Sequence, residues 1–130
     1  MNYPFIPKST SYLEPGQIWP IPLSDGNNAC GVVLAKLQGQ EGIDKRVFYA
    51  ALLDWVGNEP PDAEKINTSS FLEIGALHVK AISIIGSQII GKMEFEGLPL
   101  NPSEYSDEIV TMGYNVLSAV AEKHFVDRSS

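Results

Sequence analysis

The chain has 130 residues, a hydrophobic fraction of 44% and a formal net charge of −7 at pH 7, values typical of one acidic globular domain. This length is enough for one core without help from disulfides or metals, and no apolar run approaches the roughly 20 residues of a membrane helix. Residues 1–13 lack the pattern of a secretion signal. A single cysteine, Cys30, favours a reducing cytoplasm as the location.

The first elements follow from prolines and glycines. Residues 1–14 are expected to form an irregular arm that ends in the turn Pro15-Gly16. Residues 17–23 predict a short strand, and its two prolines, Pro20 and Pro22, place it at a sheet edge or in a bulge because neither has an N–H to donate. Residues 24–28 (Ser-Asp-Gly-Asn-Asn) predict the loop of a hairpin.

The middle of the chain predicts more strands. Residues 29–37 are almost continuously apolar, which indicates a strand covered on both faces. Residues 38–45 predict a surface loop, 47–56 a third strand rich in aromatic and branched side chains, and 57–62 a proline-containing loop. A short strand is expected over residues 71–74.

Residues 78–96 predict a second hairpin. Gly86-Ser87 has glycine first, as a type II′ turn requires. Pairing outward from this turn divides the segment into a buried face and a wet face. The buried face would hold Ile82, Ile84, Ile89, Met93 and Phe95, and the wet face Gln88, Lys92, Glu94 and Glu96.

The last element is a helix expected over about residues 107–124, with Ser106 as its N-cap. The chain is therefore predicted to be one domain, residues 1–130, with an arm (1–14), an antiparallel sheet (15–96) and a C-terminal helix (106–125). Strands followed by one helix indicate the α+β class. We expect a mainly antiparallel, strongly curved sheet or a partly open small barrel of about six strands.

The negative charge is concentrated in one span. Residues 54–108 contain ten acidic and three basic residues, which accounts for the whole excess of seven. Nucleic-acid binding needs a basic face, so no nucleic-acid partner and no membrane partner is expected. An acidic face suits a basic protein partner, although the same acids also serve solubility alone.

The sequence carries no recognisable catalytic or metal-binding pattern. His78 and His124 lie far apart in the chain, Cys30 lies in an apolar strand pattern, and the carboxylate pairs Glu94/Glu96 and Asp107/Glu108 are expected to face water. We therefore expect no catalytic residues, metal or cofactor, and no enzyme. The candidate partner-binding residues are the two tryptophans and the acids of the charged span: Trp19, Asp54, Trp55, Asp62, Glu64, Glu94, Glu96, Glu104, Asp107 and Glu108.

Residues 15–34 carry a family resemblance. Their pattern, P-G-x-I-[aromatic]-x-I-P-L-x-D-G-x-x-A-x-G-x-V-L, resembles the opening of the immunity protein 26 family of bacterial polymorphic-toxin systems, and the strand from Phe48 to Trp55 is compatible with it. The resemblance implies a non-enzymatic protein that binds and blocks a cognate secreted toxin.

Two other interpretations stay open. The P-G-x-I-W opening also resembles small SH3-like barrel toxins that cleave RNA, and an accessory domain for protein interaction without any toxin link would fit the same composition.

Overall fold

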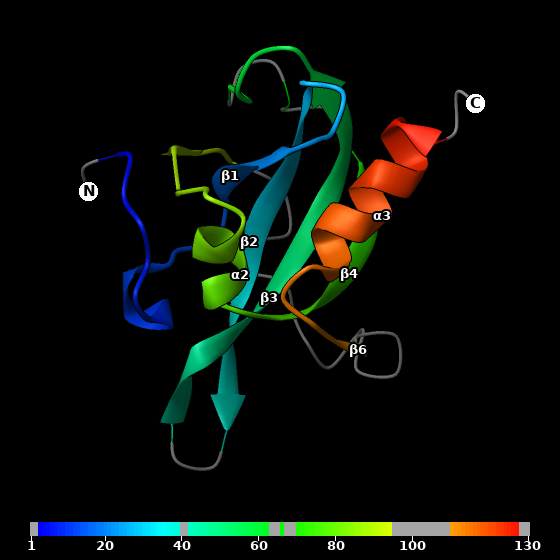
Figure 1. The fold of residues 1–130 in the computed structure, drawn as a ribbon. Helices are drawn as coiled ribbons and strands as arrows, with labels where there is room; N and C mark the ends of the chain where they lie inside the picture. Colours follow the sequence, from blue (N-terminus) through cyan, green and yellow to red (C-terminus); the bar gives the residue numbers. More distant parts are fainter. Residues whose placement is uncertain (1–2, 40–41, 63–65, 67–69, 95–109, 128–130) are drawn as a thin grey trace.

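The computed structural model of the chain describes residues 3–39, 42–62, 66, 70–94 and 110–127. These residues form a sheet of six strands in the order β5-β1-β2-β3-β4-β6, with helices packed against it (Figure 1). Every neighbouring pair is antiparallel except β4 and β6. The α+β class with a mainly antiparallel sheet is therefore confirmed, and the sheet is open, because β5 and β6 form two separate edges.

Strands β1 (Gln17–Pro22) and β2 (Asn28–Gly39) form the predicted first hairpin. In the loop between them, the Asp25 carboxylate accepts a hydrogen bond from the backbone N–H of Asn27, and Gly26 takes a positive φ of 89°. The outer side of β1 pairs with β5 (Gly91–Lys92) only at its first two residues. The two prolines of β1 therefore lie beyond that ladder, on an edge, as predicted.

The hairpin between β2 and β3 (Gly42–Gly57) corrects one prediction. Residues 38–45 were expected to be a loop, but β2 continues to Gly39 and pairs with Gly42 at the start of β3. The ribbon extends past the rest of the sheet (Figure 1). From Gly42 to Arg46 no residue is buried, so this part of the sequence lacks the alternation that would indicate a strand.

Strand β4 (Phe71–His78) is longer than predicted, and the segment after it is a short helix, α2 (Lys80–Ile84), where a hairpin strand was expected. Gly86 has a φ of 75°, and its N–H donates to the Ser83 carbonyl while the next N–H, of Ser87, donates to the Ile82 carbonyl. This pattern is a Schellman motif that ends a helix.

The helical geometry also changes which side chains are buried. Ile82 and Ile89 are in the core as expected, but Ile84 is 55% exposed, which contradicts its predicted core position. Met93 is buried and Lys92 and Glu94 are exposed, as predicted. Phe95 and Glu96 lie outside the described residues.

The C-terminal helix begins later than predicted. Val110–Met112 form strand β6, which pairs in parallel with β4, and helix α3 covers only Val116–Phe125. The apparent helical spacing of Met112 and Val116 therefore spans a strand, a turn and a helix. Met112 belongs to the strand because its side chain fills the space left by Gly75 of β4. Ser106 and residues 107–109 lie outside the described residues.

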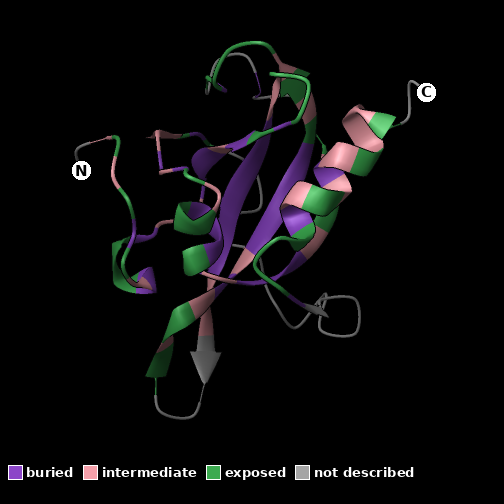
Figure 2. Ribbon diagram, in the orientation of Figure 1, coloured by how far each residue is buried: buried purple, intermediate pink, exposed green. Residues whose placement is uncertain are grey.

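Both faces of the sheet are covered. One face packs against the arm through Leu13, against α2 through Ile82 and against α3 through Leu117 and Ala121. The other face forms a second core. The central strands are accordingly buried over most of their length (Figure 2), which confirms that β2 is covered on both sides.

The arm and the last helix are attached by polar contacts. The hydroxyl of Thr10, in the 3-10 turn η1 (Thr10–Tyr12), donates to the Asp44 carbonyl at the start of β3. The Glu122 carboxylate of α3 accepts hydrogen bonds from the N–H and the hydroxyl of Ser24 in the β1–β2 loop. Over residues 3–14 the arm is irregular apart from η1 and a single bridge between Phe5 and Ile89.

Candidate functional site

Trp19 is a core residue. It is 1% exposed, and its ring meets that of Phe48 edge-on with centroids 6.0 Å apart. It cannot contact a partner without unfolding of the sheet, so its selection as a partner-binding residue is corrected. The indole sits over Gly31 of the neighbouring strand, and the strand alternation therefore points it inward.

Asp54 and Trp55 lie near the end of β3 and face different surroundings. The Asp54 carboxylate is exposed and lies 3.7 Å from Nε2 of His124 in α3. Trp55 is half-buried, packs against the second core and covers the backbone of Gly57. Asp54 therefore helps to seat α3, and part of the Trp55 indole remains accessible beside the loop that follows β3.

The acidic candidates are only partly placed. Asp62 and Glu94 are both exposed. The remaining five lie outside the described residues: Glu64, Glu96, Glu104, Asp107 and Glu108. Asp62 belongs to the 58–62 loop, and this loop forms one wall of a cleft.

The cleft has a volume of about 530 Å³ and lies between that loop and the β1–β5 edge of the sheet. Its lining combines an apolar part, two acids and one lysine: Ile18, Glu59, Pro60, Pro61, Asp62, Ile90, Gly91 and Lys92. The Lys92 ammonium lies 3.7 Å from the Glu14 carboxylate. Consecutive prolines restrict the backbone of the loop, so its acids are presented on a stiff segment. We call this site the acidic cleft.

A second hollow, of about 210 Å³, is basic. It is lined by Lys8 of the arm, Arg46 of β3, His78 at the end of β4, Val79, and Lys80 at the start of α2. Sequence reasoning missed this site because its residues come from three separate segments of the chain, around positions 8, 46 and 78–80. The only local signals were the Lys45-Arg46 pair and the close spacing of His78 and Lys80. We call this site the basic pocket.

The electrostatics of the basic pocket are set by its own residues. Burial lowers the pKa of His78, and the positive charges of Lys80 and Arg46 lower it further. The nearby Asp44 carboxylate accepts hydrogen bonds from the backbone N–H groups of Arg46 and Val47, and these bonds lower its pKa. Asp44 is therefore ionised and held against the backbone at neutral pH.

Other reactive groups are dispersed. Cys30 is buried, and burial raises the pKa of its thiol, which keeps it protonated. His78 contacts the ring of Tyr114, whereas His124 pairs with Asp54. Within the described ranges, no group of three histidine, cysteine or acidic residues is arranged to hold a metal ion.

The comparisons with known proteins give no assignment. No protein-family model matches the chain, and no curated protein or solved structure is significantly similar to it. In the part of the chain that the structure describes, none of the helices has the length and apolar character needed to cross a membrane. The features that bear on function are therefore the acidic cleft, the basic pocket and the residue pattern over positions 15–34.

Proposed function

We propose that the protein is a cytoplasmic, non-enzymatic immunity protein that captures a basic toxin at the acidic cleft and thereby neutralises it. The observation that carries the proposal is the cleft itself, in which Glu59 and Asp62 border an apolar surface. The pattern over residues 15–34 supports it, because Ile18 belongs to that pattern and also lines the cleft.

The composition of the cleft suits protein capture. Apolar contacts with the half-buried Ile90 and the exposed Pro60 would supply burial, and acids at the rim would accelerate encounter with a positively charged partner. The half-buried Trp55 near the same loop is of the residue type that most often dominates binding energy. A loop stiffened by Pro60 and Pro61 loses little conformational freedom on binding.

Reversing the charge at the cleft should slow capture. For the double variant Glu59→Lys/Asp62→Lys, we expect the association rate with the toxin to fall roughly ten-fold or more at low salt and the difference to shrink at high salt, because rim charges act through screened long-range attraction. Surface plasmon resonance at a low and a high ionic strength measures the association rate of each protein under both conditions. The candidate partner is the product of the adjacent gene.

The matched control is Glu73→Lys, which reverses an exposed acid of β4 outside the cleft lining. It should leave the association rate within about two-fold of wild type. The control changes the net charge by two units and the double variant by four, so slowing in that proportion would mean that only net charge matters. Unchanged rates in the double variant would reduce the acids to a solubility role.

The biological function needs a separate test. The partner should arrest growth when it is expressed alone, and co-expression of this protein should restore growth. A partner that binds tightly but harms no cell would favour the third interpretation, an accessory interaction domain without a toxin link.

The basic pocket supports a second candidate function, cleavage of RNA, because it joins His78 to three cationic side chains. Incubating the purified protein with RNA tests this function. Cleavage that is lost in His78→Gln would replace the immunity proposal, and intact RNA would remove the alternative.

A further inference from the structure

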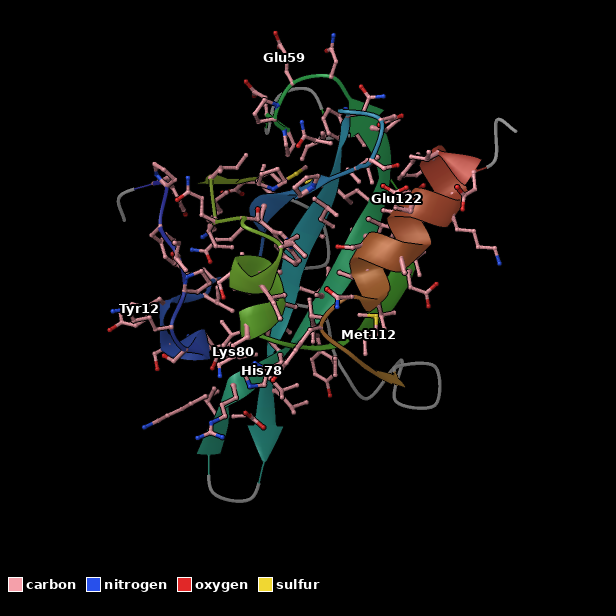
Figure 3. The ribbon with its side chains drawn as sticks, in the orientation of Figure 1. Tyr12, Glu59, His78, Lys80, Met112 and Glu122 are labelled. Carbon is pink, nitrogen blue, oxygen red and sulfur yellow. The ribbon has the colours of Figure 1, made fainter. Side chains whose placement is uncertain are left out.

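The basic pocket contrasts with the charge of the whole molecule. The chain carries a formal charge of −7, yet Lys8, Arg46 and Lys80 line one small hollow. His78 and Lys80 lie close together at one end of the sheet, and Glu59 of the acidic cleft lies at the opposite end (Figure 3). The fold therefore places the three cations of the pocket away from the acids of the cleft.

The three cations of the pocket outnumber the one acid, Asp44, that lies beside them. Lys8, Arg46 and Lys80 are not among the described residues that form ion pairs, such as Lys92 with Glu14 and His124 with Asp54. The ionised Asp44 carboxylate, hydrogen-bonded to backbone N–H groups at 2.8 and 3.0 Å, attracts Arg46 and His78 but balances only one of the three cationic charges. Like charges brought together in this way repel one another, and a bound anion would relieve that repulsion.

His78 adds a directional donor. Its Nδ1 accepts a hydrogen bond from the backbone N–H of Lys80 at 3.0 Å, which leaves the proton of the neutral ring on Nε2. The imidazole can then donate from Nε2 while it stays uncharged. The groups around it are Lys80 from α2, Arg46 and Asp44 from β3, Lys8 from the arm and Tyr114 before α3.

We propose that the basic pocket is an anion site that binds the phosphoryl group of a small molecule. A phosphoryl group carries close to two negative charges at neutral pH and offers three strong acceptor oxygens, which suits several cations converging on about 210 Å³. A carboxylate carries a single charge. A nucleic acid would need basic residues spread along a surface, whereas these cations line one hollow.

The test uses the two histidines as reporters within one sample. Inorganic phosphate is titrated into the full chain at constant ionic strength, and the imidazole signals of His78 and His124 are followed by NMR. We expect a saturable shift at His78 alone. Its pKa should rise by roughly one unit, since a bound anion stabilises the imidazolium. His124 belongs to a different site and reports non-specific ion effects.

Two variants distinguish binding of phosphate in the basic pocket from non-specific attraction to positive charge elsewhere on the surface. The double variant Arg46→Gln/Lys80→Gln should weaken phosphate binding at least about ten-fold, because it removes two charge-assisted partners. Both side chains are exposed, so folding should be retained. Lys92→Gln removes a positive charge in the acidic cleft and should leave phosphate binding unchanged.

Other probes identify the source of the phosphoryl group. Tighter binding of a phosphomonoester such as phosphoserine than of inorganic phosphate would indicate a phosphorylated metabolite, and equal affinity would indicate phosphate itself. Equal movement of both histidines, binding of acetate as strong as that of phosphate, or displacement of phosphate by an oligoribonucleotide at far lower concentration would each overturn the proposal. None of these measurements involves the toxin partner, so the outcome is independent of the immunity proposal.

Discussion

Gly31→Ala is expected to destabilise the protein by about 1–3 kcal/mol or more. Gly31 of β2 lies directly opposite Trp19 of β1. A Cβ atom at position 31 would lie 2.3 Å from two ring carbons of Trp19. The indole has no room to retreat, because it is 1% exposed and packed against Phe48. The clash must therefore be relieved by moving one of the two strands or by turning the Trp19 ring into an unfavourable rotamer.

A double-mutant cycle attributes this cost to the pair. Trp19→Leu alone should also be destabilising, since it leaves a cavity in the core. In the Trp19→Leu background, however, Gly31→Ala should cost much less than it does in the wild type, because the smaller leucine side chain leaves room for the new methyl group. Urea unfolding of the four proteins gives the coupling energy, which should exceed about 1 kcal/mol.

Gly91 provides the matched glycine control. A Cβ atom there would meet nothing within 4 Å, and Gly91 is not among the glycines with positive φ. Gly91→Ala should therefore change the free energy of unfolding by no more than about 0.5 kcal/mol. Additive effects in the Trp19/Gly31 cycle would show that the two residues do not share one tight contact.

The first two strands and the part of β3 from residue 47 onward were predictable because each carries a local signal that survives folding. The alternation in β1, the Asp-Gly loop and the continuous apolar run of β2 all depend on neighbours in sequence. The β2–β3 ribbon gave no such signal, because its strands extend past the core. The β6 strand was missed because it is held by β4, a partner that no local pattern reveals.

The α2 segment shows how one residue can satisfy two structures. Gly86 requires a positive φ, and both a type II′ hairpin turn and a Schellman motif place glycine at such a position. The isoleucines around it fit alternation and helical spacing alike over so few residues. The choice was made by packing, because Ala81 and Ile82 join the core of one sheet face.

The candidate sites were predictable only in part. Asp62 was identified from the acidic span, but the apolar residues Ile18, of β1, and Ile90, just before β5, come from distant parts of the chain. The basic pocket depends on Lys8 of the arm meeting Arg46 and Lys80, which are distant in the chain. Trp19 was misassigned because a tryptophan is equally suited to a core and to an interface, and only the tertiary structure decides between them.

Replacing two isoleucines of α2 with aspartate should give opposite results. Ile82 is 0% exposed and part of the core, whereas Ile84 is 55% exposed. Ile82→Asp is expected to cost about 3 kcal/mol or more, or to prevent folding, because it buries a carboxylate without a partner. Ile84→Asp should cost at most about 1 kcal/mol, since the new carboxylate is solvated and only opposes the weak negative end of a short helix.

The pair discriminates between the two structures that the sequence allows. A hairpin at Gly86-Ser87 would put Ile82 and Ile84 on the same buried face, and both substitutions would then be severe. The helix separates them, so thermal unfolding should show a melting temperature near that of the wild type for Ile84→Asp alone.

Lys92→Asp serves as a surface control. Its ion pair with Glu14 is exposed on both sides, so losing it should cost at most about 1 kcal/mol. Similar large losses for both isoleucine variants would mean that α2 is wrong and that residues 80–84 are extended.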